Sequence, residues 1–184
     1  MRSVSAQPTM DDEAMDEEIP VAALDHPQLL GLLRHWEAKR GPRALPARAD
    51  FRPEEMLPFL SRIVLVDVEE APRRFRFRLI GTEVVRSYGV EITGQYTDVV
   101  QPPCYRAMVE RHYGDSVDRR EPLLHRMRFV EHPGKVHELT RLTLPLSEDG
   151  SRVNMLMLAS VAEPELAHFR ERRRAARAAS LAGG

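Results

Sequence analysis

Strict alternation of apolar and charged residues marks one segment of the chain as a strand with a single buried face. In residues 74–80, RFRFRLI, phenylalanine and leucine take one side of an extended chain while arginine takes the other. Residues 62–69, RIVLVDVE, are rich in β-branched residues, and the APRR turn joins the two segments. The pattern predicts an antiparallel hairpin with one face in the core and the other in water.

Three further strands are predicted in the C-terminal half of the chain. The turn sequences HPGK and SEDGS separate them, because Pro-Gly and Asp-Gly support tight reversals. The third strand is apolar on both faces, which predicts a central strand that is covered on both sides. The expected spans are 122–131, 136–146 and 153–163.

Apolar residues at helical spacing predict two long helices and a short one. Residues 26–41 carry an apolar stripe, and residues 103–120 repeat apolar residues at the helical period. Residues 82–89 form a short amphipathic segment that starts where the second strand ends and stops at a glycine. A strand that feeds directly into a short helix is typical of a pocket wall.

The order helix, two strands, small helices, three strands, helix predicts an α+β domain on one five-stranded antiparallel sheet. The small helices are expected on one face, and the N-terminal helix on the other face or on a dimer partner. The domain is predicted to span residues 21–163. Residues 1–20 are acidic and predict a disordered tail, while residues 164–184 are expected to form a basic helix and tail.

The bulk composition is that of a soluble globular protein with one domain. The chain has 184 residues, of which 42% are hydrophobic and 30% are charged. No apolar run is long enough to cross a bilayer, and the N-terminus lacks the hydrophobic core of a secretory signal. A single cysteine, Cys104, excludes an intramolecular disulfide. These features predict a cytoplasmic protein without a membrane span.

No motif for catalysis, metal binding or nucleic-acid binding is found. HELTR at 137–141 begins like the zinc signature HExxH, but Arg141 takes the place of the second histidine and the segment is strand-like. The net charge is −1, and the arginine run at 170–177 carries no recognition motif. We therefore expect no catalytic residue, no metal site and no nucleic-acid partner, and the sequence identifies no cofactor.

Arginines on the predicted strands have two interpretations. They could form an anion-binding face, or a solvated outer face of the sheet with cross-strand carboxylates such as Glu138, and the second interpretation is favoured. The residues concerned are Arg76, Arg78, Arg126, Arg128 and Arg141.

The order of elements resembles that of PAS domains, and three segments carry the resemblance at residue level. They are LLRHWEAKRGPRALPARADFRPEEMLPFLSRIVLVDVE, RFRFRLIGTEVVRSYGVEITGQ and LPLSEDGSRVNMLMLAS. They are similar to a stand-alone bacterial PAS family, formerly catalogued as a domain of unknown function, over roughly residues 26–163. The resemblance implies a five-stranded sheet that cups a small pocket under short helices. Such pockets hold metabolites, haem, flavin or nothing, and the domains usually regulate rather than catalyse.

The candidate pocket residues are those that the pattern turns inward. They are apolar with a few polar tips, which is typical of ligand cavities and equally of an ordinary core. His125 alternates with inward apolar residues, so a buried core histidine is favoured over a haem ligand. The set is Phe77, Leu79, Val84, Tyr88, Tyr96, Met108, His112, His125, Met127 and Met157.

We expect a regulatory PAS module that senses a signal, binds a small molecule and a regulatory protein partner, and acts in trans. A homodimer is expected, with Leu29, Leu33 and Trp36 as part of its interface. Two alternatives stay open. One is a ligand-free interaction adaptor, and the other is a small cone-shaped α+β enzyme that would use His112 with Asp115 as an acid–base pair.

Overall fold

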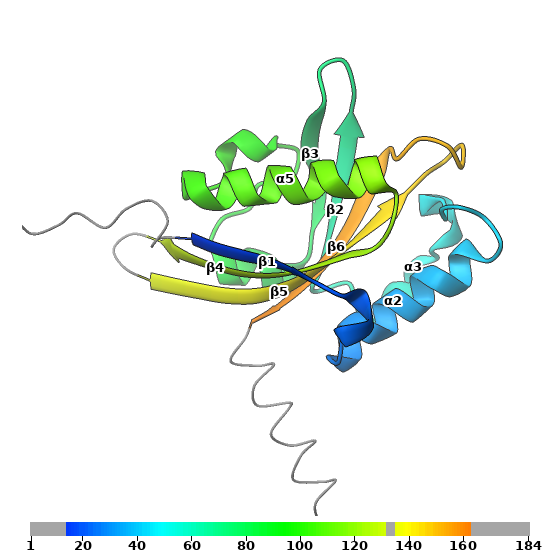
Figure 1. The fold of residues 1–184 in the computed structure, drawn as a ribbon, viewed down its shortest axis with the longest axis horizontal. Coiled ribbons are helices and arrows are strands. Elements are labelled where there is room, and N and C mark those ends of the chain that lie inside the picture. The colour runs from blue at the N-terminus through cyan, green and yellow to red at the C-terminus, as the bar shows by residue number, and fades with distance from the viewer. Residues whose placement is uncertain (1–13, 132–134, 163–184) are drawn as a thin grey trace, which may run out of the picture.

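The computed structural model describes residues 14–131 and 135–162 of the chain. Within them, six antiparallel strands form one sheet in the order β1-β4-β5-β6-β2-β3 (Figure 1). The strands are β1 Ala14–Ile19, β2 Ile63–Glu69, β3 Arg74–Ile80, β4 Leu123–Glu131, β5 Lys135–Leu146 and β6 Met155–Ala162. The helices are α2 Pro27–Arg40, α3 Pro53–Met56, α4 Thr82–Tyr88 and α5 Pro103–Arg119, with short 3-10 turns at Val21–Ala23, Arg48–Asp50 and Thr97–Val99.

The α+β class and the five strands predicted from the sequence are confirmed. The predicted bounds differ from the observed ones most at the start of β6, which was expected at 153 and begins at Met155. The expected C-terminal helix at 164–184 lies outside the described residues. None of the described helices combines the length and the apolar character that crossing a bilayer requires.

β1 is a sixth strand that the sequence pattern did not predict. Residues 1–20 were expected to be disordered, yet Ala14–Ile19 pairs antiparallel with β4, with Asp16 opposite Met127 and Glu17 opposite Arg126. The segment is acidic, and its carboxylates form ion pairs with basic side chains on neighbouring elements. Arg119 on α5, for example, pairs with Glu18 at 2.7 Å. Composition alone could not reveal this, because the compensating charges lie about a hundred residues away in the chain.

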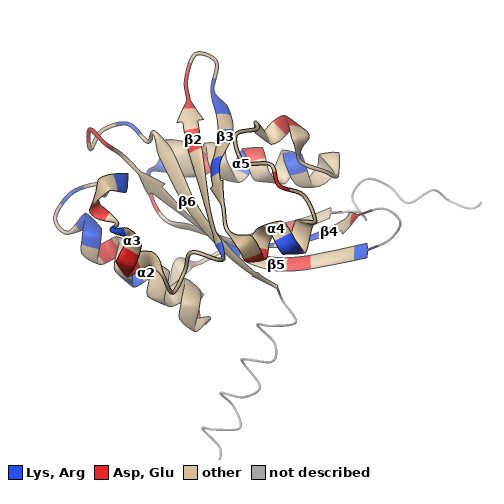
Figure 2. Cartoon of the chain, turned by 180° about the vertical axis from the view of Figure 1, so that it is seen from behind, with Lys and Arg blue, Asp and Glu red and all other residues tan. Residues whose placement is uncertain are grey.

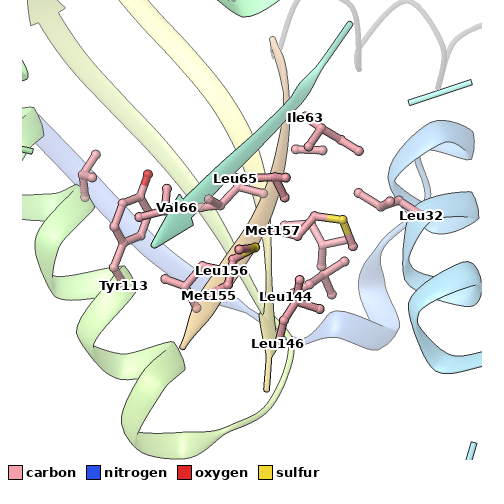
Figure 3. Close-up of a cluster of buried hydrophobic side chains, with 14 of the residues drawn as sticks. Leu32, Ile63, Leu65, Val66, Tyr113, Leu144, Leu146, Met155, Leu156 and Met157 are labelled. Carbon is pink, nitrogen blue, oxygen red and sulfur yellow. The ribbon is translucent and has the colours of Figure 1, made fainter. Parts of the chain in front are cut away.

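Helices cover both faces of the sheet, which we name after α5 and α2. On the α5 face, Val66 of β2 lies beside Leu156 of β6, and on the α2 face Leu65 lies beside Met157. Figure 3 shows this two-sided core, with Tyr113 of α5 and Leu32 of α2 approaching the strands from opposite sides. β6 is apolar on both faces and carries no charged residue (Figure 2), as the sequence predicted for a covered central strand.

The N-terminal helix packs on the chain's own sheet. Leu29, Leu33 and Trp36 keep only 1%, 6% and 2% of their surface exposed, and Trp36 Nε1 donates to the carbonyl of Pro145 on β5 at 3.0 Å. The three side chains expected at a dimer interface are therefore core residues of a single chain. Their role in self-association stays a prediction, and it would require α2 to leave the sheet.

β3 runs into α4 with no connecting loop because Gly81 is packed backbone to backbone. The Gly81 amide donates to the carbonyl of Ile63 at 2.8 Å, and the Glu83 amide donates to that of Ser61 at 2.8 Å. A Cβ at position 81 would clash with the Ser61 carbonyl and would lie 2.6 Å from the oxygen of Leu60. Only glycine fits this close approach, which fixes the point where α4 leaves the sheet.

Candidate functional site

A cavity of about 1140 Å³ lies on the α5 face of the sheet. Its volume is comparable to that of small-molecule pockets, which run to about 1,000 Å³. The walls come from β2, β3, the end of β4, β5, β6, α4, α5 and the segment 90–101. Apolar side chains from the sheet and from α5 form much of the wall, among them Val64, Phe77, Leu158, Val109 and Tyr113.

The segment after α4 closes the cavity along the edge of β3. The Gly94 amide donates to the carbonyl of Phe77 at 2.6 Å, and the Phe77 amide donates to that of Gln95 at 2.9 Å. Gly94 has φ of 84°, a left-handed conformation that favours glycine. These bonds attach the segment to β3 as an extra edge, so the wall is held by backbone contacts.

Arg141 is a buried cation in the wall of this cavity. It lies on β5, keeps 6% of its surface exposed, and lines the cavity together with Ser160 and Tyr105. Its Nε donates to Ser160 Oγ at 3.3 Å and its Nη2 donates to the Tyr105 hydroxyl, while its Nη1 has no acceptor among the described residues. The expected solvated outer face therefore does not include Arg141, because the register of β5 turns it toward α5.

Aromatic rings form a stacked column beside Arg141. Tyr105 of α5 stacks on Phe129 of β4 with centroids 4.0 Å apart, and Phe129 stacks on His137 of β5 at 4.7 Å. Tyr88 of α4 extends the column at 6.0 Å from Tyr105, and the two phenol hydroxyls share a hydrogen bond. The Tyr105 ring lies 5.5 Å from the guanidinium carbon of Arg141. The column thus links α4 to the sheet through the polar centre of the cavity wall.

The acidic side chains of the cavity wall have partners of their own. Glu83 pairs with Arg62 at 2.8 Å, and Glu131 pairs with His137 at 2.8 Å. The remaining two follow the same rule: Glu138 lies 3.4 Å from Arg128, and Glu91 accepts the amide of Thr93 at 2.8 Å. Three of these four acidic side chains therefore lie beside a basic side chain, and Glu91 is held by a backbone amide.

A second polar cluster lies beneath β1, outside the cavity wall. His112 of α5 is 0% exposed, and its ring stacks on that of His125 of β4 with centroids 3.6 Å apart. Burial lowers the pKa of His112, although Asp16 partly offsets the effect, and burial also lowers the pKa of His125 to about 4. His112 binds Asp16 and not Asp115, so the acid–base pair proposed for an enzyme is not assembled in the described structure.

Three of the ten expected pocket residues line the cavity: Phe77, Val84 and Tyr88. The other seven do not. Four of them are buried elsewhere in the molecule: Met108, His112, His125 and Met127. Met157 lies on the α2 face of the sheet. The Tyr96 ring lies under Arg74, and its hydroxyl donates to Glu69.

A β-bulge explains why Leu79 does not line the cavity as the sequence predicted. Simple alternation puts Leu79 on the same side as Phe77. The register shifts between Leu65 and Val66, however, so that Leu79 faces Leu65 and Ile80 faces Val64. Ile80 therefore lines the cavity in place of Leu79. Tyr105 and Arg141 were also absent from the expected set. For Arg141, the alternation of His137, Leu139 and Arg141 on the inward side of β5 was the available signal.

Within the part of the chain that the structure describes, no group of three or more histidine, cysteine or acidic side chains could hold a metal ion.

Residues 24–159 match the family model described as PAS domain. Among solved structures, the PAS domain of BvgS from Bordetella pertussis is similar, with 16% identity, a TM-score of 0.47, and coverage of 64% of this chain and 90% of that one. The LOV protein of Rhodobacter sphaeroides is similar with 13% identity, a TM-score of 0.45, and coverage of 76% and 68%. No curated protein matches the chain. The family match extends from the start of α2 into β6 and includes all of α4 and α5.

Proposed function

The chain belongs to the PAS domain family, and we propose that it is a cytoplasmic regulatory module that senses a small molecule in the cavity on its α5 face. Membership of the family points to a signal-sensing, regulatory role. The observation that supports small-molecule binding is the cavity itself, about 1140 Å³ in volume. Largely apolar walls with a few convergent polar groups are typical of small-molecule sites.

The element proposed to report the ligand is α4. Its residues contribute Val84 and Tyr88 to the cavity wall, yet none of its seven residues is buried. Tyr88 remains 38% exposed while its hydroxyl bonds to that of Tyr105. A helix with so little buried surface can move at low cost. A ligand that displaces or fixes Tyr88 would change the outer surface of α4.

The proposed readout of that surface is a regulatory protein that the module contacts in trans, with the module itself acting as a homodimer. PAS domains often mediate such interactions. Sizing chromatography with light scattering tests the dimer, and a pull-down from the native cell tests the partner. A monomeric mass at working concentrations would contradict the dimer without affecting the proposal for the cavity.

Native mass spectrometry of the full chain tests the sensing role. We expect a small molecule of reproducible mass to remain bound to freshly purified protein. The substitution Val84→Trp places a large side chain at the cavity wall and is expected to remove that mass while circular dichroism stays native. Val85→Trp is the matched control, because Val85 lies on the same helix and does not line the cavity. If protein from every growth condition shows only the mass of the ligand-free chain, the result would instead support the ligand-free adaptor.

A further inference from the structure

Arg141 differs from the other cations of the cavity wall in having no acidic partner within the described part of the chain. Arg62 pairs with Glu83, and Lys135 lies near Glu131 at 3.8 Å. Among the described residues, the acceptors of its hydrogen bonds are hydroxyl groups, although only 6% of the Arg141 surface is exposed. Guanidinium remains charged when buried. A buried charge without a counter-ion is costly, so a neutral hydroxyl shell leaves this charge incompletely compensated.

The hydrogen bonds around Arg141 leave an excess of donors. Arg141 Nη1 carries two N–H groups and finds no acceptor in residues 14–131 and 135–162. Tyr105 and Tyr88 share one hydrogen bond, so one of their two hydroxyl hydrogens is left over. Ser160 accepts from Arg141 and, within the described residues, donates to none. The one buried side-chain atom of this cluster without a partner among the described residues, Arg141 Nη1, is a donor, and donors gathered around a positive charge are complementary to an anion.

We propose that the cavity ligand is an apolar organic molecule with a single carboxylate, and that Arg141, with the hydroxyls of Tyr105 and Tyr88, binds the carboxylate. This inference rests on the proposed sensing function and gives the chemical class of its ligand. The planar guanidinium matches the two oxygens of a carboxylate. The body of the ligand lies against the apolar wall made by Val64 and Leu158.

The charge of the site favours a carboxylate over a phosphate. A phosphate monoester carries roughly −1.5 to −2 charge at neutral pH. Arg141 supplies one positive charge, and the nearby rim carboxylates already occupy the other cations. A monoanion is neutralised by this site, whereas a phosphate would keep part of its charge in an apolar cavity.

Access to Nη1 requires a side chain of the wall to move, because Nη1 is covered in this arrangement. Tyr88 is the group placed to move. It ends the chain of contacts from Arg141 through Tyr105, and it sits on a helix with no buried residue. Entry of the carboxylate would replace the Tyr88–Tyr105 bond, which connects ligand binding to the position of α4.

Isothermal titration of the full chain with two matched probe pairs tests the assignment: octanoate with 1-octanol, and 4-phenylbutanoate with 4-phenyl-1-butanol. In at least one pair we expect the acid to bind about tenfold or more tightly than the alcohol, as a charge-assisted bond to arginine predicts. The Arg141→Met variant is expected to lose this preference and still bind the alcohol. Arg62→Met is the matched control, because Arg62 lines the same cavity but already pairs with Glu83, and it should keep the preference.

The outcomes separate this proposal from the one on which it rests. If acid and alcohol bind equally to the unaltered chain, the cavity still binds ligands but the carboxylate assignment is wrong. This comparison needs no variant, so it holds even if Arg141→Met does not fold. Tighter binding of octyl phosphate than of octanoate would also overturn the assignment. If no probe binds and native mass spectrometry finds no ligand, the sensing function itself fails.

Discussion

Asp16 Oδ2 lies 2.7 Å from His112 Nε2 and joins β1 to α5 across 96 residues of sequence. The same carboxylate accepts a hydrogen bond from Arg111, and its side chain is only 13% exposed. Burial acts to raise the pKa of Asp16, but the bonds from His112 and Arg111 outweigh burial and lower it. No residue of β1 is fully buried. The strand is therefore held by its pairing with β4 and by this polar contact more than by apolar packing.

Replacing Asp16 should loosen β1 from the rest of the fold. We expect Asp16→Ala to lower the free energy of unfolding by about 1.5–3 kcal/mol, the usual range for hydrogen bonds to a charged group. Hydrogen exchange should show faster exchange of the β1 amides, with β5 and β6 unchanged. Glu17→Ala is the control, since its carboxylate is 64% exposed and 3.4 Å from Arg126, and it should change stability by less than about 0.5 kcal/mol. Equal effects of the two changes would contradict a special role for Asp16.

Acid should destabilise the fold through the stacked histidines. The pKa of His125 falls from 6.5 to about 4 because of burial and of the neighbouring His112, although Asp16 and Glu18 act against the shift. The unfolded chain therefore takes up a proton near pH 6.5 that the folded chain does not accept until about pH 4, so stability falls as the pH drops through this window. At about 1.4 kcal/mol per pKa unit, His125 accounts for roughly 3 kcal/mol of that loss.

Urea denaturation between neutral pH and pH 4 measures this dependence. The variant His125→Phe keeps a stacked ring and removes the titrating group, so its stability should fall less steeply with acid. His112 and Asp16 still titrate in the variant. The pKa of Asp16 is already below its usual 3.8, so its contribution is lost only at lower pH. A curve for His125→Phe that is as steep as that of the unaltered chain would assign the acid sensitivity elsewhere.

The junction at Gly81 should tolerate no side chain. Since a Cβ there would lie 2.6 Å from the Leu60 oxygen, Gly81→Ala forces backbone to move, and we expect a loss of at least about 1–3 kcal/mol in the free energy of unfolding. The matched control is Gly114→Ala in the middle of α5, where a Cβ meets nothing within 4 Å. That change should stabilise the chain by about 0.4–1 kcal/mol, because alanine restricts the unfolded chain and suits a helix. Similar effects at both positions would refute the close packing at Gly81.

Local patterns predicted the elements well because their signals are local. The RFRFRLI alternation, the two long helical stripes and the apolar β6 depend on residues within a few positions of one another. The site was predicted less well because its composition depends on register. One bulge replaces Leu79 with Ile80 in the cavity wall. A strand such as β6 is apolar on both sides, so its sequence does not show which face of the sheet the helix beside the cavity covers.

Side-chain contacts between distant segments were the other source of error. The acidic residues of β1 resemble a disordered tail until Arg111, Arg119 and Arg126 are brought beside them by the fold. Arg141 resembles a surface residue by composition, and the β5 register buries it. In both cases the residue type was informative, but its partner was separated by tens of residues and could not be identified from one sequence.

Leu33 distinguishes a core role for α2 from a role in self-association. Its side chain is 6% exposed against the α2 face of the sheet, so Leu33→Ala should lower the free energy of unfolding by about 2–5 kcal/mol, the range for a buried leucine. Leu30→Ala, at a partly buried position of the same helix, should cost less. Light scattering on the folded fraction should give the same mass for both variants and for the unaltered chain. A Leu33→Ala chain that keeps its stability and changes only its mass would instead place α2 between two copies and remove it from the core.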